Sequence, residues 1–175
     1  MTVSDQNRRR VRRALETTAE TLNFAAAQAE AGAWRWAAIS TCMALQGALV
    51  AALSGYETAQ LAHVAHPDEA DKVASISTLL RRAASPDYLA DPERLSGQNG
   101  AKRQALELVE LRNQVVHMPL DGRAVDSEAI TSALPGTLAL MQHLLIDHPA
   151  FQASDGEPHT SRIKAALARF SLSLC

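Results

Sequence analysis

The chain has 175 residues, of which 47% are hydrophobic and only 4% aromatic, and its formal net charge is −2. This length suits one domain over residues 1–175, and a core with so few aromatic side chains must be built from Ala, Leu, Val and Ile, which favours helices over sheets. Cys42 and Cys175 are far apart and form no CxxC pair, so neither a disulfide framework nor a zinc site is expected. The first residues are polar and basic, which predicts a cytoplasmic protein without a signal peptide.

The N-terminal part is predicted to contain two long helices. Residues 1–7 are expected to be frayed, and the first helix is predicted from Arg8 to Glu30. The second is predicted from Trp34 to Leu61 and has no charged residue between Ala37 and Gly55. An uncharged stretch of this length can span a membrane, but a buried central helix gives the same signal. Its Ser, Thr, Gln and Gly residues favour the central helix, so no membrane contact is predicted.

Five arginines lie close together at the start of the first predicted helix: Arg8, Arg9, Arg10, Arg12 and Arg13. Because the whole chain has a small negative charge, this segment is a basic arm on an acidic body. Two interpretations remain open. The arginines either form a solvated helical surface, as charge runs usually do, or they contact phosphate, an acidic partner or a neighbouring subunit.

The middle of the chain is predicted to contain a third helix, Asp68–Ala84, followed by a long loop. His63 and His66 precede the helix, but they lack a clear third ligand, so no metal site and no cofactor are predicted. Residues 85–100 form the longest irregular stretch, and connections of this length are more often functional or mobile than idle. Because the loop leads directly into the next helix, it is a candidate lid or groove wall.

The segment LELVELRNQVVHMP, from Leu106 to Pro119, is the one in which residue types and spacing together suggest chemistry. Apolar residues at helical spacing predict a helix from Ala101 to His117. Pro119 disfavours helical geometry at the residue before it, so the helix should end close to His117. Within the helix, Arg112 and His117 are five residues apart, which places them roughly 140° around the axis and about 7.5 Å along it.

Arg112, Asn113 and His117 are candidate catalytic residues. An imidazole gives and takes protons near neutral pH, and a guanidinium binds phosphate oxygens. An amide between them can orient a substrate oxygen or the imidazole ring. Together they suit cleavage of a phosphodiester without a metal. The alternative is structural, because Arg and His at a helix C-terminus also complement the helix dipole and cap free carbonyls.

The C-terminal part is predicted to be helical as well. After a turn at residues 120–123, a helix is predicted to begin at Asp126 or Ser127. Pro135 either breaks this helix or forms the first residue of a second one. A last amphipathic helix is predicted to begin at Thr160. No internal repeat and no strand pattern is found.

The segment RNQVVH resembles the signature of the HEPN family, which comprises nucleotide-binding and ribonuclease domains. That signature is an Arg, a polar residue directly after it, and a His after a gap of four to six residues, and Arg112, Asn113 and His117 match it. The resemblance covers most of the chain as an order of helices, but in specific residues only this segment. It implies an all-α, up-and-down bundle of about five to six helices in a single domain, with the motif on a late helix.

The resemblance also implies a function. Two subunits would pair and bring two motifs into one cleft, giving a metal-independent endoribonuclease of a toxin–antitoxin or phage-defence system. His117 would assist attack by a ribose 2′-OH or protonate the leaving oxygen, Arg112 would stabilise the charged transition state, and Asn113 would position groups. Products would carry 2′,3′-cyclic phosphate and 5′-OH ends. The side chains expected to contact RNA phosphates are Arg8, Arg9, Arg10, Lys102 and Arg103.

One position departs from the family pattern. Some members carry a Tyr two residues after the His, which an antitoxin modifies, and this chain has Pro119 there. Pairing with that kind of antitoxin is therefore in doubt. Two alternatives to the ribonuclease remain open. One is a non-catalytic HEPN-like module that binds a nucleotide or a protein partner, and the other is a structural dimeric bundle in which Arg112 and His117 are helix caps.

Overall fold

The computed structural model describes residues 2–117, 126–157 and 159–174. Within these residues the chain forms seven α-helices, one 3-10 turn and one π-helical turn, and no strand. The predicted all-α bundle is therefore confirmed. The elements are α1 (Val3–Glu30), α2 (Trp34–Leu53), η1 (Leu61–His63), α3 (Ile76–Ala83), α4 (Asn99–His117), α5 (Ser127–Gln142), η2 (His143–Asp147), α6 (Ala153–Gly156) and α7 (His159–Leu172).

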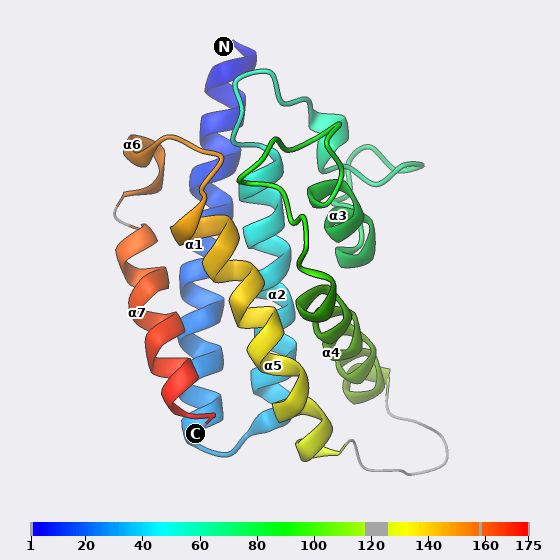
Figure 1. Ribbon diagram of the computed structural model, residues 1–175, viewed down its shortest axis with the longest axis vertical. Coiled ribbons are helices and arrows are strands. Elements are labelled where there is room, and N and C mark those ends of the chain that lie inside the picture. Colours follow the sequence, from blue (N-terminus) through cyan, green and yellow to red (C-terminus); the bar gives the residue numbers. More distant parts are fainter. Residues whose placement is uncertain (1, 118–125, 158, 175) are drawn as a thin grey trace.

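The long helices lie side by side and alternate in direction (Figure 1). α1 and α2 form the central pair; α7 packs against α1, and α4 and α5 pack against α2 and each other. α1 buries a regular stripe that includes Val11, Leu15 and Leu22. α2 buries residues around most of its circumference, as expected for a central helix. The buried hydroxyls of Thr18 and Thr41 donate to carbonyls of their own helices, at 2.7 Å in both cases, so they need no polar partner in the core.

α1 begins at Val3, five residues earlier than predicted. Thr2 and Asp5 form a capping box, in which each side chain binds the backbone N–H of the other residue. Asn7 is buried, and its amide donates to the carbonyl of Ala59 at 2.7 Å. The expectation of a frayed segment over residues 1–7 was therefore wrong for the part that the structure describes.

α2 ends at Leu53, before the predicted Leu61, because the chain turns at Gly55 to pass another segment. A Cβ at Gly55 would lie 2.7 Å from the carbonyl carbon of Ala150. α3 is likewise shorter than predicted and begins at Ile76, capped by Ser75. The acidic residues after position 67 do not form the first turn of a helix. They belong to an irregular connection that is held by backbone hydrogen bonds between its own residues.

α4 is held against α5 by a close backbone approach. A Cβ at Gly136 would lie 2.9 Å from the Cα of Ala101, and the Gln104 side chain donates to the Ser132 carbonyl at 2.9 Å. Pro135 lies within α5 without breaking it, and its ring is exposed. The predicted turn at residues 120–123, like Pro119, lies outside the described residues.

Within the described residues, two helical stretches are long and apolar enough to cross a membrane by length and composition, Trp34–Leu53 and Ser127–Asp147. The most apolar windows of these stretches are 72% and 56% buried inside the bundle. Core helices of soluble proteins show the same combination of length, composition and burial.

Replacing Gly136 with Ala tests the α4–α5 contact. The added methyl meets the backbone of Ala101, so we expect the free energy of unfolding to fall by about 1–3 kcal/mol. This loss would appear although Ala is the better helix former by about 1 kcal/mol. Urea unfolding followed by circular dichroism measures it. Gly100→Ala is the control, because a Cβ there has nothing within 4 Å; equal effects of the two substitutions would contradict the packing argument.

Candidate functional site

The motif lies on the last turns of α4, where the sequence predicted it. The side of α4 that faces the bundle follows a regular spacing through Ala101, Ala105 and Leu108 to Arg112. Ala105 and Leu108 are fully buried, and Arg112 is half-buried. Arg112 therefore occupies the position at which an apolar residue would continue the buried stripe.

Arg112 lies beside Cys42 of α2. The Cys42 thiol is buried and donates weakly to the carbonyl of Leu108, with 3.8 Å between sulfur and oxygen. Burial raises the pKa of this thiol to about 11, and the nearby Arg112 charge opposes that rise. The Nε of Arg112 is buried without a hydrogen-bond partner. Among the described residues no carboxylate forms an ion pair with Arg112.

Asn113 and His117 lie on a neighbouring side of the same helix. They are four residues apart, so their side chains are neighbours on the helix surface. Asn113 is half-buried and His117 is exposed at the helix end. Arg112, by contrast, lies about 140° around the axis from His117. The three residues come from one helix end but do not point to one place within a single chain.

The predicted phosphate contacts lie elsewhere. Arg8, Arg9 and Arg10 are in the first turns of α1, at the opposite end of the long axis from the end of α4 (Figure 1). Lys102 and Arg103 are in the first turn of α4, more than three helical turns, or about 20 Å, before His117. One chain therefore does not gather these residues around the motif.

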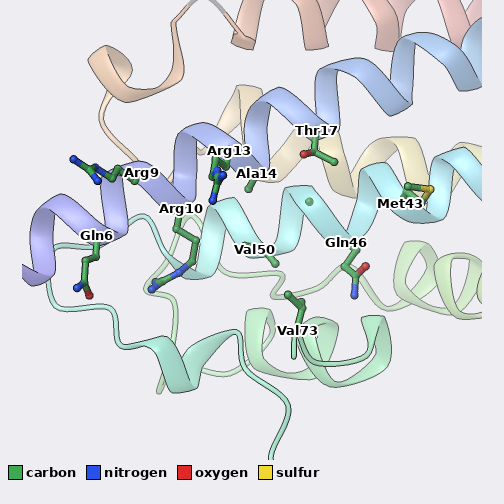
Figure 2. A pocket seen from close by; sticks show the side chains of 11 residues that line it. Gln6, Arg9, Arg10, Arg13, Ala14, Thr17, Met43, Gln46, Val50 and Val73 are labelled. Atoms are coloured by element: carbon green, nitrogen blue, oxygen red, sulfur yellow. The ribbon is translucent and has the colours of Figure 1, made fainter. Parts of the chain in front are cut away.

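One hollow of the described surface lies between α1 and α2. It has a volume of about 510 Å³, and the residues around it include Arg10, Arg13, Met43 and Val50 (Figure 2). Arg112, Asn113 and His117 do not line this hollow.

The structure also locates the two histidines that were considered as metal ligands. His63 packs edge-on against Tyr88, with 5.2 Å between ring centroids. Burial and the nearby charges of Arg82 and Arg10 lower its pKa. The ring nitrogen Nδ1 of His66 accepts from the backbone N–H of Asp68 at 3.2 Å. Among the described residues, no group of three or more His, Cys, Asp or Glu side chains is arranged to hold a metal ion.

Sequence reasoning missed two features of this region. It considered Cys42 for a disulfide or a zinc site but not as a neighbour of Arg112, because nothing in the sequence gives the register of α2 against α4. It also treated the five N-terminal arginines as one cluster. Helical spacing separates them, since Arg8 and Arg12 lie on one side of α1 and Arg9 and Arg13 on another.

Replacing Arg112 with Met tests whether this arginine serves the fold. Met keeps a long flexible stem but removes a half-buried charge that has no acidic partner in the described part of the chain. We therefore expect the free energy of unfolding to change by less than about 1 kcal/mol. Leu108→Ala, one turn earlier and fully buried, is the positive control and should cost about 2–5 kcal/mol. A loss above about 2 kcal/mol for Arg112→Met would identify a structural arginine.

The raised pKa of Cys42 predicts a loss of stability in alkali. The unfolded thiol ionises at about pH 8.5, whereas the folded thiol ionises near pH 11. The contribution of the protonated Cys42 thiol to the free energy of unfolding is complete below pH 8.5. It is lost as the pH rises towards 11, because between these values only the unfolded chain loses the proton. Relative to Cys42→Ala, the wild type should lose about 2 kcal/mol between pH 8 and pH 10.5 in urea unfolding. If the difference in unfolding free energy between the wild type and Cys42→Ala did not change with pH, the thiol would not be desolvated.

Comparison with known proteins gives no match: no family model, no curated protein and no solved structure matches this chain. The functional argument therefore depends on the motif and on its place in the fold.

Proposed function

We propose that the chain is a metal-independent endoribonuclease of the HEPN type, with Arg112, Asn113 and His117 as its catalytic residues. The observation that carries the proposal is the state of Arg112. It is half-buried in the bundle-facing stripe of α4, its Nε has no hydrogen-bond partner, and no described carboxylate pairs with it. A structural arginine in such a place is normally paired. An arginine that has no carboxylate partner among the described residues has donors to spare for an anionic substrate, and phosphate is the anion whose geometry it fits.

The proposed reaction uses the ribose 2′-OH as the nucleophile. A neutral His117 removes the 2′-OH proton while the 2′ oxygen forms a bond to phosphorus. The bond between phosphorus and the 5′ oxygen breaks, and that oxygen takes a proton from an imidazolium. Arg112 stabilises the negative charge that develops on the non-bridging oxygens. The products carry a 2′,3′-cyclic phosphate and a 5′-OH, and DNA is resistant because it lacks the nucleophile.

The proposed active unit is a homodimer. One imidazole cannot remove a proton from the 2′-OH and deliver one to the leaving oxygen in the same step, so two copies of His117 are needed. The exposure of His117 at the end of α4 supports this arrangement, because nothing described on its own chain covers it. A cytoplasmic ribonuclease of this kind suits a toxin–antitoxin or phage-defence system, in which an antitoxin or another protein partner restrains it.

A second candidate is the non-catalytic module that binds a nucleotide or a protein partner. The observation in its favour is that Arg112 and His117 point in different directions on α4. A guanidinium and an imidazole can each bind phosphate without acting on the same phosphorus atom. Saturable nucleotide binding with intact RNA would favour this candidate.

The ribonuclease proposal predicts that structured RNA is cut in the presence of EDTA by the wild type and not by Arg112→Ala or His117→Ala. The expected loss is at least about 100-fold, because each substitution removes a group that acts only in the transition state. Gel assays give the rate, and mass spectrometry of the fragments gives the end groups.

Arg81→Ala and His66→Ala are matched controls, because Arg81 is exposed on α3 and His66 lies on the connection before it, so neither residue belongs to the motif helix. Circular dichroism confirms that each variant is folded. Cutting by His117→Ala at the wild-type rate would show that the activity belongs to something other than the motif.

A further inference from the structure

The N-terminal arginines divide into two groups with different surroundings. Arg8 and Arg12 approach the buried carboxylate of Asp155, with 3.8 Å and 3.3 Å between nitrogen and oxygen. Arg10 and Arg13 lie on the other side of α1 and border the hollow between α1 and α2 (Figure 2). Among the described residues, neither of these two arginines forms an ion pair. The described part of the chain therefore leaves two positive charges in the wall of the hollow without a carboxylate.

Arg10 is held in place by a buried side chain. Its Nη1 donates to the side-chain oxygen of Asn7 at 2.9 Å, and the amide nitrogen of Asn7 donates to the carbonyl of Ala59 at 2.7 Å. Asn7 is 4% exposed, so this link ties the guanidinium to the segment after α2. Partial burial lowers the pKa of Arg10, as expected for a charge that has lost part of its water. A guanidinium has five N–H donors, so the hydrogen bond to Asn7 leaves donors for a ligand.

The wall of the hollow carries positive charge and no negative charge. Among the described residues that line it there is no Asp or Glu. Arg9, the third arginine of the wall, is one helical turn from Asp5, which balances part of its charge. Arg10 and Arg13 therefore form the cationic end of the hollow.

Aliphatic side chains form much of the remaining wall. Val50 and Met43 come from α2, and Val73 comes from the connection before α3. Met43 and Val73 are 51% and 50% exposed, so apolar surface is left in contact with water. The floor lies at Gly47, where a Cβ would be 3.1 Å from the carbonyl oxygen of Ala14. The helices are thus too close there for a side chain to fill the hollow.

The charged and aliphatic parts follow one another along the hollow. Figure 2 shows the two arginines towards the start of α1, Val50 near the middle and Met43 at the other end. Val50 and Met43 are seven residues apart, which is about 10 Å along α2. The amide nitrogen of Gln46 lies between them, but it donates to the carbonyl of Ala74 at 3.2 Å. A ligand that fits this order has an anion at one end and an apolar chain behind it.

We propose that the hollow between α1 and α2 binds a fatty acid of medium chain length. The carboxylate accepts hydrogen bonds from Arg10 and Arg13, because its two oxygens match the fork of a guanidinium. The alkyl chain runs along α2 over Gly47 towards Met43. It covers the apolar surface of Met43 and Val73, and removing that surface from water favours binding.

The size and the lining of the hollow favour this class of ligand. Its volume of about 510 Å³ lies within the range of small-molecule pockets, roughly 300–1,000 Å³. Proteins commonly hold nucleobases by stacking them on aromatic rings, and no described aromatic side chain lines the hollow. A phosphate ion would satisfy the arginines but would leave the aliphatic wall in water.

The test is calorimetric titration of the delipidated protein with laurate below its micelle concentration. We expect saturable binding of one laurate per chain. Dodecanol has the same chain without the charge, and inorganic phosphate has charge without the chain. Each should bind at least about tenfold more weakly than laurate, because each lacks one of the two kinds of contact.

Substitutions locate the carboxylate. Arg10→Gln and Arg13→Gln each remove one charge from the hollow and should raise the dissociation constant of laurate by about tenfold. Arg12→Gln is the matched control, because it removes the same charge from the side of α1 that faces Asp155. At physiological salt it should change the dissociation constant by less than about twofold. Circular dichroism confirms that each variant is folded.

Nuclear magnetic resonance locates the alkyl chain. The methyl signal of Met43 should shift as laurate is added, because the chain packs against it. Met141 is fully buried in the core, so its methyl signal is the internal control and should stay in place.

Four outcomes would overturn the proposal. One is the absence of saturable laurate binding, even if the protein sediments with phosphatidylglycerol vesicles, which would assign the face to an anionic membrane surface. Phosphate that binds as tightly as laurate would make the arginines a phosphate site. Equal affinity of Arg10→Gln and the wild type for laurate, or an unshifted Met43 signal, would place the ligand elsewhere. None of these outcomes bears on RNA cleavage, because the motif residues do not line the hollow.

Discussion

The close approach of α1 and α2 is the constraint on which the rest of the bundle depends. Small residues, above all Ala14, Gly47 and Ala44, let the two backbones come close together. The buried Thr18 hydroxyl donates a hydrogen bond to a carbonyl of its own helix. Small side chains lose little conformational entropy on burial, so a core with few aromatic residues can still be stable. Every other long helix packs on this pair or on a helix that does. The same contact also leaves the shallow hollow on the outer side of the pair.

Much of the fold could be predicted from the sequence, because apolar residues recur at helical spacing along the long helices. Both ends of α4 and the start of α7 were predicted to within a few residues, since turn residues and prolines mark them. The start of α1 was predicted five residues too late, at Arg8, because the capping box of Thr2 and Asp5 was not recognised in the polar N-terminal segment. The sequence also left open whether Pro135 begins a helix or lies inside one, because a proline can do either.

The region between α2 and α3 was the least predictable, and the reason is tertiary. Its acidic residues suggest a helix N-terminus, but Ser75 provides the cap instead. The preceding segment is held by Arg82, which donates to the carbonyls of His63 and Ala65 at 3.1 and 2.9 Å. An arginine that binds carbonyls of an earlier loop leaves no pattern in the sequence.

The candidate site, too, could be predicted only in part from the sequence. The sequence placed Arg112, Asn113 and His117 at the end of one helix, and they lie there. It could not show that Arg112 faces α2 and the Cys42 thiol, because that depends on how α4 is rotated about its own axis. The rotation is set by Ala101, Ala105 and Gly136, whose only feature is small size. The separation of Arg112 from His117 around the helix is one more reason to expect the active unit to need two chains.

The two halves of α4 are held very differently. Its first half is fixed by Gly136, by the Gln104 hydrogen bond and by the buried Ala105 and Leu108. After Leu108 no residue of α4 is fully buried. Local opening needs the least free energy where buried contacts are fewest. Amide protons should therefore exchange slowly before Leu108 and progressively faster towards His117. The motif thus lies on a helix end that can unwind while the first half of the helix stays fixed.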